Sequence, residues 1–279
     1  MNYRHAFHAG AFQDVHKHAV LALLLRHLGE KPAPYCVLDT HAGIGRYDLE
    51  GTEAQKTGEF RHGIGRLLAA TGAPAAAAPY LDLVRRMNGG GALRRYPGSP
   101  ELAARLSRPK DRLVLMELHT DDARRLEHAF AGDDRVAVHH EDGYRGLKAF
   151  LPPRERRGLV LIDPPFEEAG EFERLADGLK IAHRRWPTGT YVLWYPIKDL
   201  PPVRRFHAQL RQSGIRKIML SELLVRAATS AESLNGSGLA VVNPPWRLEA
   251  ALEQLLPWLG ERLAQGAGAA GTWRWLVPE

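Results

Sequence analysis

Apolar runs without hydrophobic–polar alternation recur along this chain of 279 residues, and segments with helical periodicity separate them. The runs are rich in Val, Leu and Ile and occupy residues 35–40, 112–118, 135–140, 158–163, 190–195, 217–225, 238–243 and 272–277. A strand without alternation is buried on both faces, which is typical of parallel sheets covered by helices. The pattern therefore predicts an α/β fold with a mostly parallel sheet between helices.

The spacing between the first two runs is unusually long. Roughly 70 residues separate them, although one strand–helix–strand crossover needs only about 30. The excess contains the alanine-rich segment 69–78 and has helix signals at 63–68 and 80–87. We therefore predict a main domain of residues 1–48 and 111–279, with residues 49–110 inserted as a small helical subdomain.

Charge and composition limit the classes of partner and location. The chain has 38 Lys and Arg, 32 Asp and Glu, a net charge of +6 and a pI near 9.5, which favours a polyanionic partner. Arginine pairs such as Arg85-Arg86 suit phosphate, although any single pair is more simply a solvated helix face. The single cysteine, the lack of an apolar signal segment and the absence of an apolar run near ~20 residues predict a cytoplasmic protein outside the membrane. We expect a monomer by default.

Polar residues follow three of the apolar runs. Asp39 precedes a turn with Gly43 and Gly45, which is looser than a dinucleotide fingerprint and closer to the nucleoside-binding turn of methyltransferases. Glu117 ends the second run, where a carboxylate can accept both ribose hydroxyls. Asp142 and Gly143 follow the third run, where an acidic side chain can contact an adenine amino group. Together they predict a site for S-adenosylmethionine.

The fourth run ends in Asp163-Pro164-Pro165-Phe166, which suits methyl transfer to an exocyclic amino nitrogen. The lone pair of such a nitrogen is delocalised into its ring, so acceptors at Asp163 and at the carbonyl of Pro164 would favour a pyramidal nitrogen. The prolines stiffen the turn, and Phe166 would stack on an extruded base.

A second, similar tetrapeptide is Asn243-Pro244-Pro245-Trp246. Pro-Pro after a strand can be no more than a tight stop, so strand order must decide between the two. Asp163 ends the strand expected beside the first, next to the cofactor, whereas Asn243 follows an expected antiparallel edge strand. We assign catalysis to Asp163, Pro164 and Phe166, and structure to Asn243.

Motifs spread over the whole chain carry a family resemblance; they are Tyr3-Arg4-His5-Ala6-Phe7-His8-Ala9-Gly10, Lys17-His18, Leu38-Asp39-Thr40-His41-Ala42-Gly43, Tyr96-Pro97-Gly98-Ser99-Pro100, Ile162-Asp163-Pro164-Pro165, Leu193-Trp194-Tyr195-Pro196 and Asn243-Pro244-Pro245-Trp246. The chain closely resembles the bacterial 23S ribosomal RNA adenine-N6 methyltransferases of the RlmJ family. The resemblance implies a Rossmann-like class I methyltransferase domain with an inserted helical subdomain, and 23S rRNA as partner.

The resemblance also implies roles for individual residues. The cofactor and catalytic site would be lined by His18, His41, Ser99, Glu117, Asp142, Gly143 and Asp163, and Tyr3 would touch the RNA. The family commonly has tyrosine where this chain has Phe166, a change that keeps stacking but removes a hydroxyl contact. No metal is expected, because methyl transfer needs none and because no cysteine and no second carboxylate cluster accompanies the histidines near the start.

Two alternative functions stay open at this point. The same chemistry could act on DNA adenine or on a protein glutamine, although no large target-recognition domain is evident. The chain could also be a non-catalytic RNA-binding or assembly protein, against which the intact Asp163 tetrapeptide and Glu117 argue.

Overall fold

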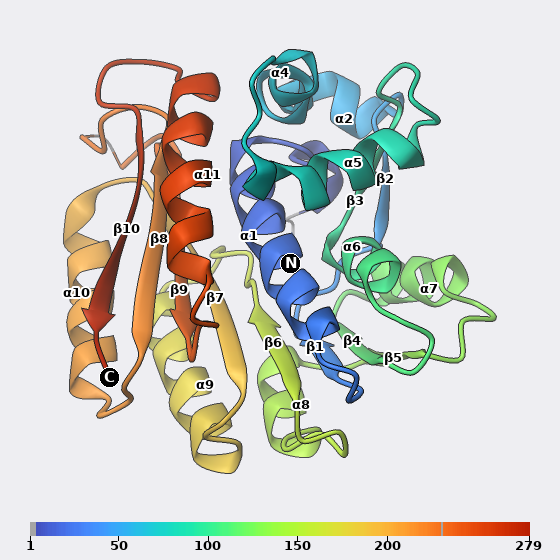
Figure 1. The fold of residues 1–279 in the computed structure, drawn as a ribbon, viewed down its shortest axis with the longest axis vertical. Coiled ribbons are helices and arrows are strands. Elements are labelled where there is room, and N and C mark those ends of the chain that lie inside the picture. The colour runs from blue at the N-terminus through green and yellow to red at the C-terminus, as the bar shows by residue number, and fades with distance from the viewer. Residues whose placement is uncertain (1–3, 230) are drawn as a thin grey trace.

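A computed structural model describes residues 4–229 and 231–279, and within them one large sheet has eight strands. Its order is β10-β8-β9-β7-β6-β1-β4-β5 (Figure 1). The strands are β1 (Cys36–Asp39), β4 (Arg112–Glu117), β5 (Val136–His140), β6 (Gly158–Ile162), β7 (Thr190–Ile197), β8 (Ile218–Leu224), β9 (Gly236–Val242) and β10 (Ala270–Val277). Every apolar run of the sequence is therefore a strand.

Strand direction divides the sheet into two parts. The strands β5, β4, β1, β6 and β7 pair in parallel, whereas β9, β8 and β10 continue the sheet with antiparallel pairs. The predicted mostly parallel α/β sheet is confirmed. The expectation of an edge position for the strand before Asn243 is wrong, because β9 lies between β7 and β8. The C-terminal strand β10 returns alongside β8 and satisfies the backbone groups that β8 would otherwise expose at the edge.

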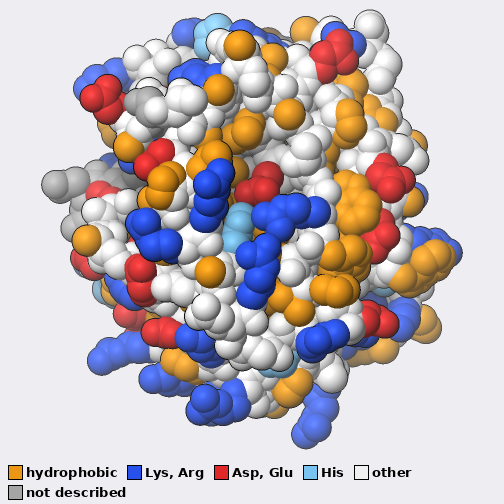
Figure 2. All heavy atoms as spheres, turned by 90° about the vertical axis from the view of Figure 1, so that its left-hand side faces the viewer, with side chains coloured by type: hydrophobic (Ala, Val, Ile, Leu, Met, Phe, Trp, Pro, Cys, Tyr) orange, Lys and Arg blue, Asp and Glu red, His pale blue; other side chains and the backbone are white. Residues whose placement is uncertain are grey.

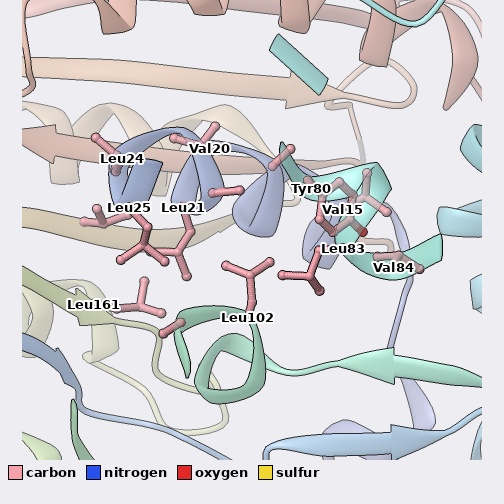
Figure 3. Packing of buried hydrophobic residues seen from close by; sticks show 14 of the residues in the cluster. Val15, Val20, Leu21, Leu24, Leu25, Tyr80, Leu83, Val84, Leu102 and Leu161 are labelled. Atoms are coloured by element: carbon pink, nitrogen blue, oxygen red, sulfur yellow. The ribbon is translucent and has the colours of Figure 1, made fainter. Parts of the chain in front are cut away.

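Helices cover both faces of the sheet (Figure 1). On one face lie α1 (Phe12–Glu30), α6 (Ser99–Leu106), α7 (Thr120–Ala129) and α11 (Leu248–Arg262); on the other lie α8 (Gly143–Ala149), α9 (Glu171–Arg185) and α10 (Leu200–Gln212). The side chains of Leu21 and Leu25 on α1 point towards Leu102 of α6 and Leu161 of β6 (Figure 3). Such burial of aliphatic side chains is worth about 1.5–3 kcal/mol each.

Helix α1 is buried around most of its circumference, because the sheet, α5 (Ala78–Met87), α6 and α11 surround it. Its buried residues include polar ones, namely Asp14, His16, Lys17 and His18. Buried polar groups are costly unless they are hydrogen-bonded or paired. Each of these four side chains therefore requires a specific partner, and those partners define the site described below.

The segment between β1 and β4 leaves the sheet and returns through a short antiparallel pair, β2 (Arg46–Asp48) and β3 (Arg95–Pro97). Between these strands lie η2 (Ala75–Ala77) and the helices α2 (Thr52–Thr57), α3 (Glu59–His62), α4 (Ile64–Ala69) and α5 (Ala78–Met87), and η1 (His5–Phe7) contacts α2. The expected helices at 63–68 and 80–87 correspond to α4 and α5. The division into domains at residues 49 and 110 stays a prediction.

Basic side chains are scattered over the face drawn in Figure 2, with a group near its centre and others along its lower rim. Acidic side chains lie among them, so this face does not carry one continuous basic stripe. Over the described part of the chain, no helix combines the length and apolarity needed to cross a membrane.

Candidate active site

Four acidic side chains lie at the carboxyl edge of the parallel strands. Asp39 ends β1 and Glu117 ends β4, while Asp142 follows β5 and Asp163 follows β6. Strand β1 pairs with β4 on one side and with β6 on the other, so the chain order reverses at this point. Ligands of open α/β sheets bind in the crevice at such a reversal. The sheet thus brings together the strand ends that the sequence singled out.

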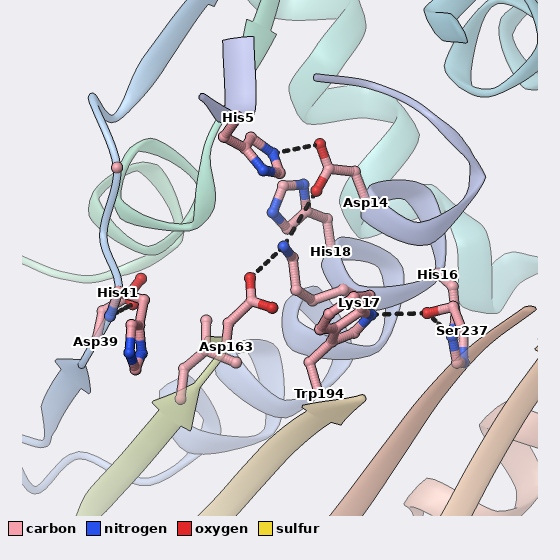
Figure 4. A network of polar contacts seen from close by, with 12 residues as sticks. His5, Asp14, His16, Lys17, His18, Asp39, His41, Asp163, Trp194 and Ser237 are labelled. Carbon is pink, nitrogen blue, oxygen red and sulfur yellow. Dashed lines mark hydrogen bonds and ion pairs between the residues drawn. The ribbon is translucent and has the colours of Figure 1, made fainter. Parts of the chain in front are cut away.

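Asp163 is held by a buried lysine from α1. The Nζ of Lys17 forms a short ion pair with Oδ2 of Asp163 and lies 3.1 Å from Oδ1 of Asp14 (Figure 4). Burial lowers the pKa of Lys17, but the Asp163 and Asp14 carboxylates outweigh this effect and the net pKa is raised. Lys17 is therefore a cation that fixes one carboxylate oxygen of Asp163, Oδ2.

Asp14 extends this network to the N-terminal segment. Its Oδ2 accepts hydrogen bonds from the amide of Gly10 at 3.0 Å and from Nε2 of His5 at 2.9 Å. Burial raises the pKa of Asp14, yet His5 and Lys17 hold it well below its usual range. A chain of polar contacts thus runs from His5 through Asp14 and Lys17 to Asp163.

Lys17, Asp14 and His5 were not predicted as site residues, although Lys17 and His5 belong to the family motifs. A signal was present: Asp14 and Lys17 have i,i+3 spacing inside an otherwise apolar helical segment. Charged residues are rarely fully buried unless they are paired, so this pair could have been suspected. Its partner Asp163, 146 residues further along the chain, could not.

Two backbone amides fix the carboxylate of Glu117. Its two carboxylate oxygens accept the amides of Gly43 and His119, each at 2.8 Å. Burial raises its pKa, an effect that these amide bonds reduce. A carboxylate has about four lone-pair sites, so acceptor capacity would remain for a ribose hydroxyl. The residues present therefore fit the adenosyl part of S-adenosylmethionine.

The turn after β5 closes the other side of this crevice. Asp142 is the N-cap of α8 and accepts the amide of Tyr144 at 2.8 Å. Gly143 packs so closely on β1 that an added Cβ would lie 2.2 Å from the carbonyl oxygen of Thr40. His41 follows β1, with Nδ1 2.7 Å from Oγ1 of Thr40 and its ring against Tyr144 of α8. Burial lowers the pKa of His41 to about 4, so the ring is neutral.

Ser99 begins α6 and is buried beside Asp39. Burial raises the pKa of Asp39 to about 6, although a hydrogen bond from Ser99 acts in the opposite direction. The side chain of His18 is buried, with Nδ1 2.9 Å from the hydroxyl of Tyr96 in β3, which in turn lies 2.9 Å from the hydroxyl of Tyr80. His18 thus links α1 to the inserted segment, and its predicted cofactor contact stays a prediction. Tyr3 lies outside the described residues.

The two Pro-Pro turns lie at opposite ends of the sheet. Phe166 follows β6, with φ of +52°, and packs edge-on against Phe172 and Trp194 at ring separations of 4.8 and 5.8 Å. Asn243 follows the antiparallel β9, so it lies at the start of β7, where its amide donates to the carbonyls of Pro187 and Gly189 at 2.9 and 2.8 Å. Its side chain is therefore engaged in holding the chain between α9 and β7.

A metal centre finds no support in residues 4–229 and 231–279, which contain no group of three or more His, Cys, Asp or Glu side chains able to hold an ion. The histidines near the start serve other partners: His5 contacts Asp14, His8 lies 3.0 Å from Glu59, and His16 and His18 contact hydroxyl groups.

Comparison with known proteins agrees with this geometry. Ribosomal RNA large subunit methyltransferase J of Haemophilus influenzae is 42% identical over 280 residues, and the Escherichia coli protein of the same name is 42% identical over 279; both comparisons cover 100% of each chain. A crystal structure of a Legionella pneumophila protein matches with a TM-score of 0.86 and 32% identity, covering 96% of this chain and 97% of that one. A probable spermidine synthase of Corynebacterium glutamicum shares the fold alone, with a TM-score of 0.53, 12% identity, and coverage of 95% of this chain and 75% of that one.

Residues 32–277 match the family model described as ribosomal RNA large subunit methyltransferase D, RlmJ. The predicted Rossmann-like sheet of class I methyltransferases and the predicted family are both confirmed. Because the family model and two full-length relatives span nearly all of the chain, this protein belongs to the RlmJ family of ribosomal RNA large subunit methyltransferases.

Proposed function

We propose that this protein transfers one methyl group from S-adenosylmethionine to the exocyclic N6 of a specific adenine in 23S rRNA, acting as a monomer in the cytoplasm. The observation that carries the proposal is the position of Asp163, directly after β6 and beside the acidic end of β1, with a buried lysine on one of its oxygens. Family membership supplies the class of reaction and the ribosomal RNA.

The cofactor supplies an electrophilic methyl group on its sulfonium sulfur. Glu117 would hold its ribose and Asp142 its adenine, with Gly143, His41, Ser99 and His18 completing the pocket. These assignments rest on the strand-end geometry and on the family resemblance. The hydrogen bonds that already orient Glu117 and Asp142 support them, because a fixed carboxylate positions a ligand without further loss of side-chain entropy.

The target amino group would donate its hydrogens to Oδ1 of Asp163 and to the carbonyl oxygen of Pro164. As the nitrogen formed its bond to the methyl carbon, the carbon–sulfur bond of the cofactor would break, and the carboxylate of Asp163 would accept the proton that the nitrogen releases. Lys17 keeps Asp163 in one orientation while this occurs. Phe166 would stack on the adenine. Proximity and alignment of this kind supply much of the acceleration in transfer between two bound partners.

The decisive experiment measures transfer of labelled methyl groups to protein-free 23S rRNA, to intact large subunits and to DNA, followed by mass mapping of modified adenines. We expect incorporation at one adenine of the RNA. Asp163→Ala should abolish transfer while it retains most of the cofactor affinity, and Asn243→Ala is the matched control that should stay active. Incorporation only into DNA or protein, or into no substrate, would refute the proposed function, and an active Asp163→Ala would show that catalysis lies elsewhere.

Tyr3 is proposed to contact the RNA. The network from His5 through Asp14 and Lys17 supports this role, because it ties the beginning of the described chain to the catalytic aspartate. Removal of residues 1–3 should raise the KM for RNA far more than the Kd for S-adenosylmethionine. Equal losses in both quantities would argue against a substrate contact.

A further inference from the structure

His16 is a buried polar residue that the proposed chemistry does not use. It lies on α1 beside Lys17, is fully buried, and contacts two serines of neighbouring strands. Its Nδ1 lies 3.0 Å from Oγ of Ser237 in β9, and its Nε2 lies 2.9 Å from Oγ of Ser221 in β8. Burial lowers the pKa of His16 to about 3, so the ring is neutral and has one donor and one acceptor nitrogen.

Ser237 connects this histidine to an aromatic side chain near the active site. The indole Nε1 of Trp194 in β7 donates to Oγ of Ser237 at 3.0 Å (Figure 4). An indole N–H can only donate, so Ser237 accepts here and its own proton is available to Nδ1 of His16. The bonds then run head to tail, from Trp194 through Ser237 to His16, and bonds arranged in this way strengthen one another.

Trp194 in turn packs against Phe166. Their ring centroids are 5.8 Å apart with planes at 77°, and Phe172 of α9 packs against Phe166 from another side at 4.8 Å. Phe172 is itself supported by Phe206 of α10 at 5.3 Å. Phe166 has φ of +52°, an uncommon conformation for a residue with a side chain that surrounding contacts must maintain. Trp194 and Phe172 provide two of these contacts.

We propose that Ser237 and His16 are positioning residues for methyl transfer: they hold the indole of Trp194 so that it fixes the ring of Phe166 for stacking on the target base. That a target base stacks on Phe166 rests on the proposed function. The hydrogen bonds connect α1 with β7 and β9, which are far apart in the sequence, and no hydroxyl or imidazole among them touches the reacting atoms.

Three substitutions separate this role from general stability. Ser237→Ala removes both the acceptor of Trp194 and the donor to His16. Trp194→Phe keeps an aromatic ring but removes the N–H. Ser221→Ala is the matched control, because it removes a buried serine hydroxyl on the same histidine and leaves the bond between Trp194 and Ser237 in place.

The first measurement needs no substrate. Fluorophenylalanine is introduced at position 166 and its ¹⁹F resonance is recorded in the full-length protein. We expect a shifted and broadened resonance in Ser237→Ala and in Trp194→Phe, and an unchanged one in Ser221→Ala. An unchanged resonance in Ser237→Ala, or an equal change in Ser221→Ala, would overturn the proposal. The resonance tests the positioning role even if the wild-type protein transfers no methyl group to RNA, an outcome that would refute the proposed function alone.

The second measurement is turnover. For Ser237→Ala we expect about a tenfold loss in kcat/KM for RNA with the Kd for S-adenosylmethionine within about twofold of wild type, because a factor of ten is the size of one lost hydrogen bond at about 1.4 kcal/mol. In a Phe166→Leu background the same substitution should add less than about twofold, since coupled residues are not additive. An undiminished tenfold effect in that background would show that Ser237 does not act through Phe166.

Discussion

Replacing Lys17 by methionine tests the central electrostatic claim about the site. Lys17 has a side chain 5% exposed and lies between Asp14, which is fully buried, and Asp163. Methionine fills a similar volume without charge, so the main effect is to leave a buried carboxylate without its cation. Removal of one partner from a buried ion pair typically costs about 3–5 kcal/mol. At about 2–4 °C for each kcal/mol, the melting temperature should fall by roughly 10 °C.

The loss should depend on pH in a definite direction. In the wild type the pKa of Asp14 is depressed, so its stabilising contribution persists from pH 7.5 to pH 5 and disappears only in stronger acid. Without Lys17, the pKa of Asp39, which burial raises and Lys17 lowers in the wild type, should rise further above its unfolded value, so the variant gains stability as the pH falls. The difference between the two proteins should therefore shrink by about 1–2 kcal/mol between pH 7.5 and pH 5.

Urea unfolding of Lys17→Met at both pH values measures these quantities. Lys180→Met is the matched control, because Lys180 pairs with Asp177 at 3.0 Å on the surface, where such a pair contributes about 0–1 kcal/mol. The double variant Asp14→Asn with Lys17→Met should recover part of the lost stability but not the methyl transfer proposed for Asp163. A stability cost of Lys17→Met no greater than that of Lys180→Met, or one that is the same at both pH values, would contradict this electrostatic role of Lys17.

Three other predictions follow from the same geometry. Gly143→Ala should weaken binding of S-adenosylmethionine at least about tenfold in calorimetry, because its Cβ would lie 2.2 Å from the carbonyl oxygen of Thr40. Gly29→Ala is the control and should leave binding unchanged, because its added Cβ meets nothing within 4 Å. Equal effects of the two substitutions would contradict a role of the turn at Gly143 in cofactor binding. Glu117→Gln should raise the Kd for S-adenosylmethionine by about tenfold or more, since hydrogen bonds to a charged group are worth about 1.5–3 kcal/mol. The kcat at saturating cofactor should change little, and a fall in kcat alone would contradict a role of Glu117 in cofactor binding. Burial lowers the pKa of His16 and of His18 to about 3, so their contribution to stability is present above pH 6.5 and is lost as the pH falls towards 3. From pH 6.5 to 5 the loss is on the order of 1–2 kcal/mol for each histidine, and Asp39, whose raised pKa of about 6 acts in the opposite sense, offsets about 1 kcal/mol of it. A flat urea-unfolding profile across this range would contradict the neutral, buried state of these histidines.

The strands, and the polar residues at their ends, could be predicted from the sequence. A strand that is buried on both faces is a continuous run of apolar residues, which local sequence shows directly. The assignment of catalysis to Asp163 over Asn243 relied only on strand order and direction, and the structure places the two turns at opposite ends of the sheet. The short strands β2 and β3 were not predicted, because three-residue strands show no periodicity. The interior position of β9 was missed because its pairing with both β7 and β8 is decided by contacts that local sequence patterns do not record.

By itself the sequence determined the α/β class, the carboxyl-edge residues Asp39, Glu117 and Asp163, and the family, since each is recorded in residue type and local spacing. Only the tertiary structure decided what surrounds Asp163. The ion pair with Lys17 joins residues 146 positions apart, and the bonds of His16 to Ser221 and Ser237 span 205 and 221 positions. Polar groups inside α1 must find partners once the helix is buried, but which partners they meet depends on how the helix lies across the sheet.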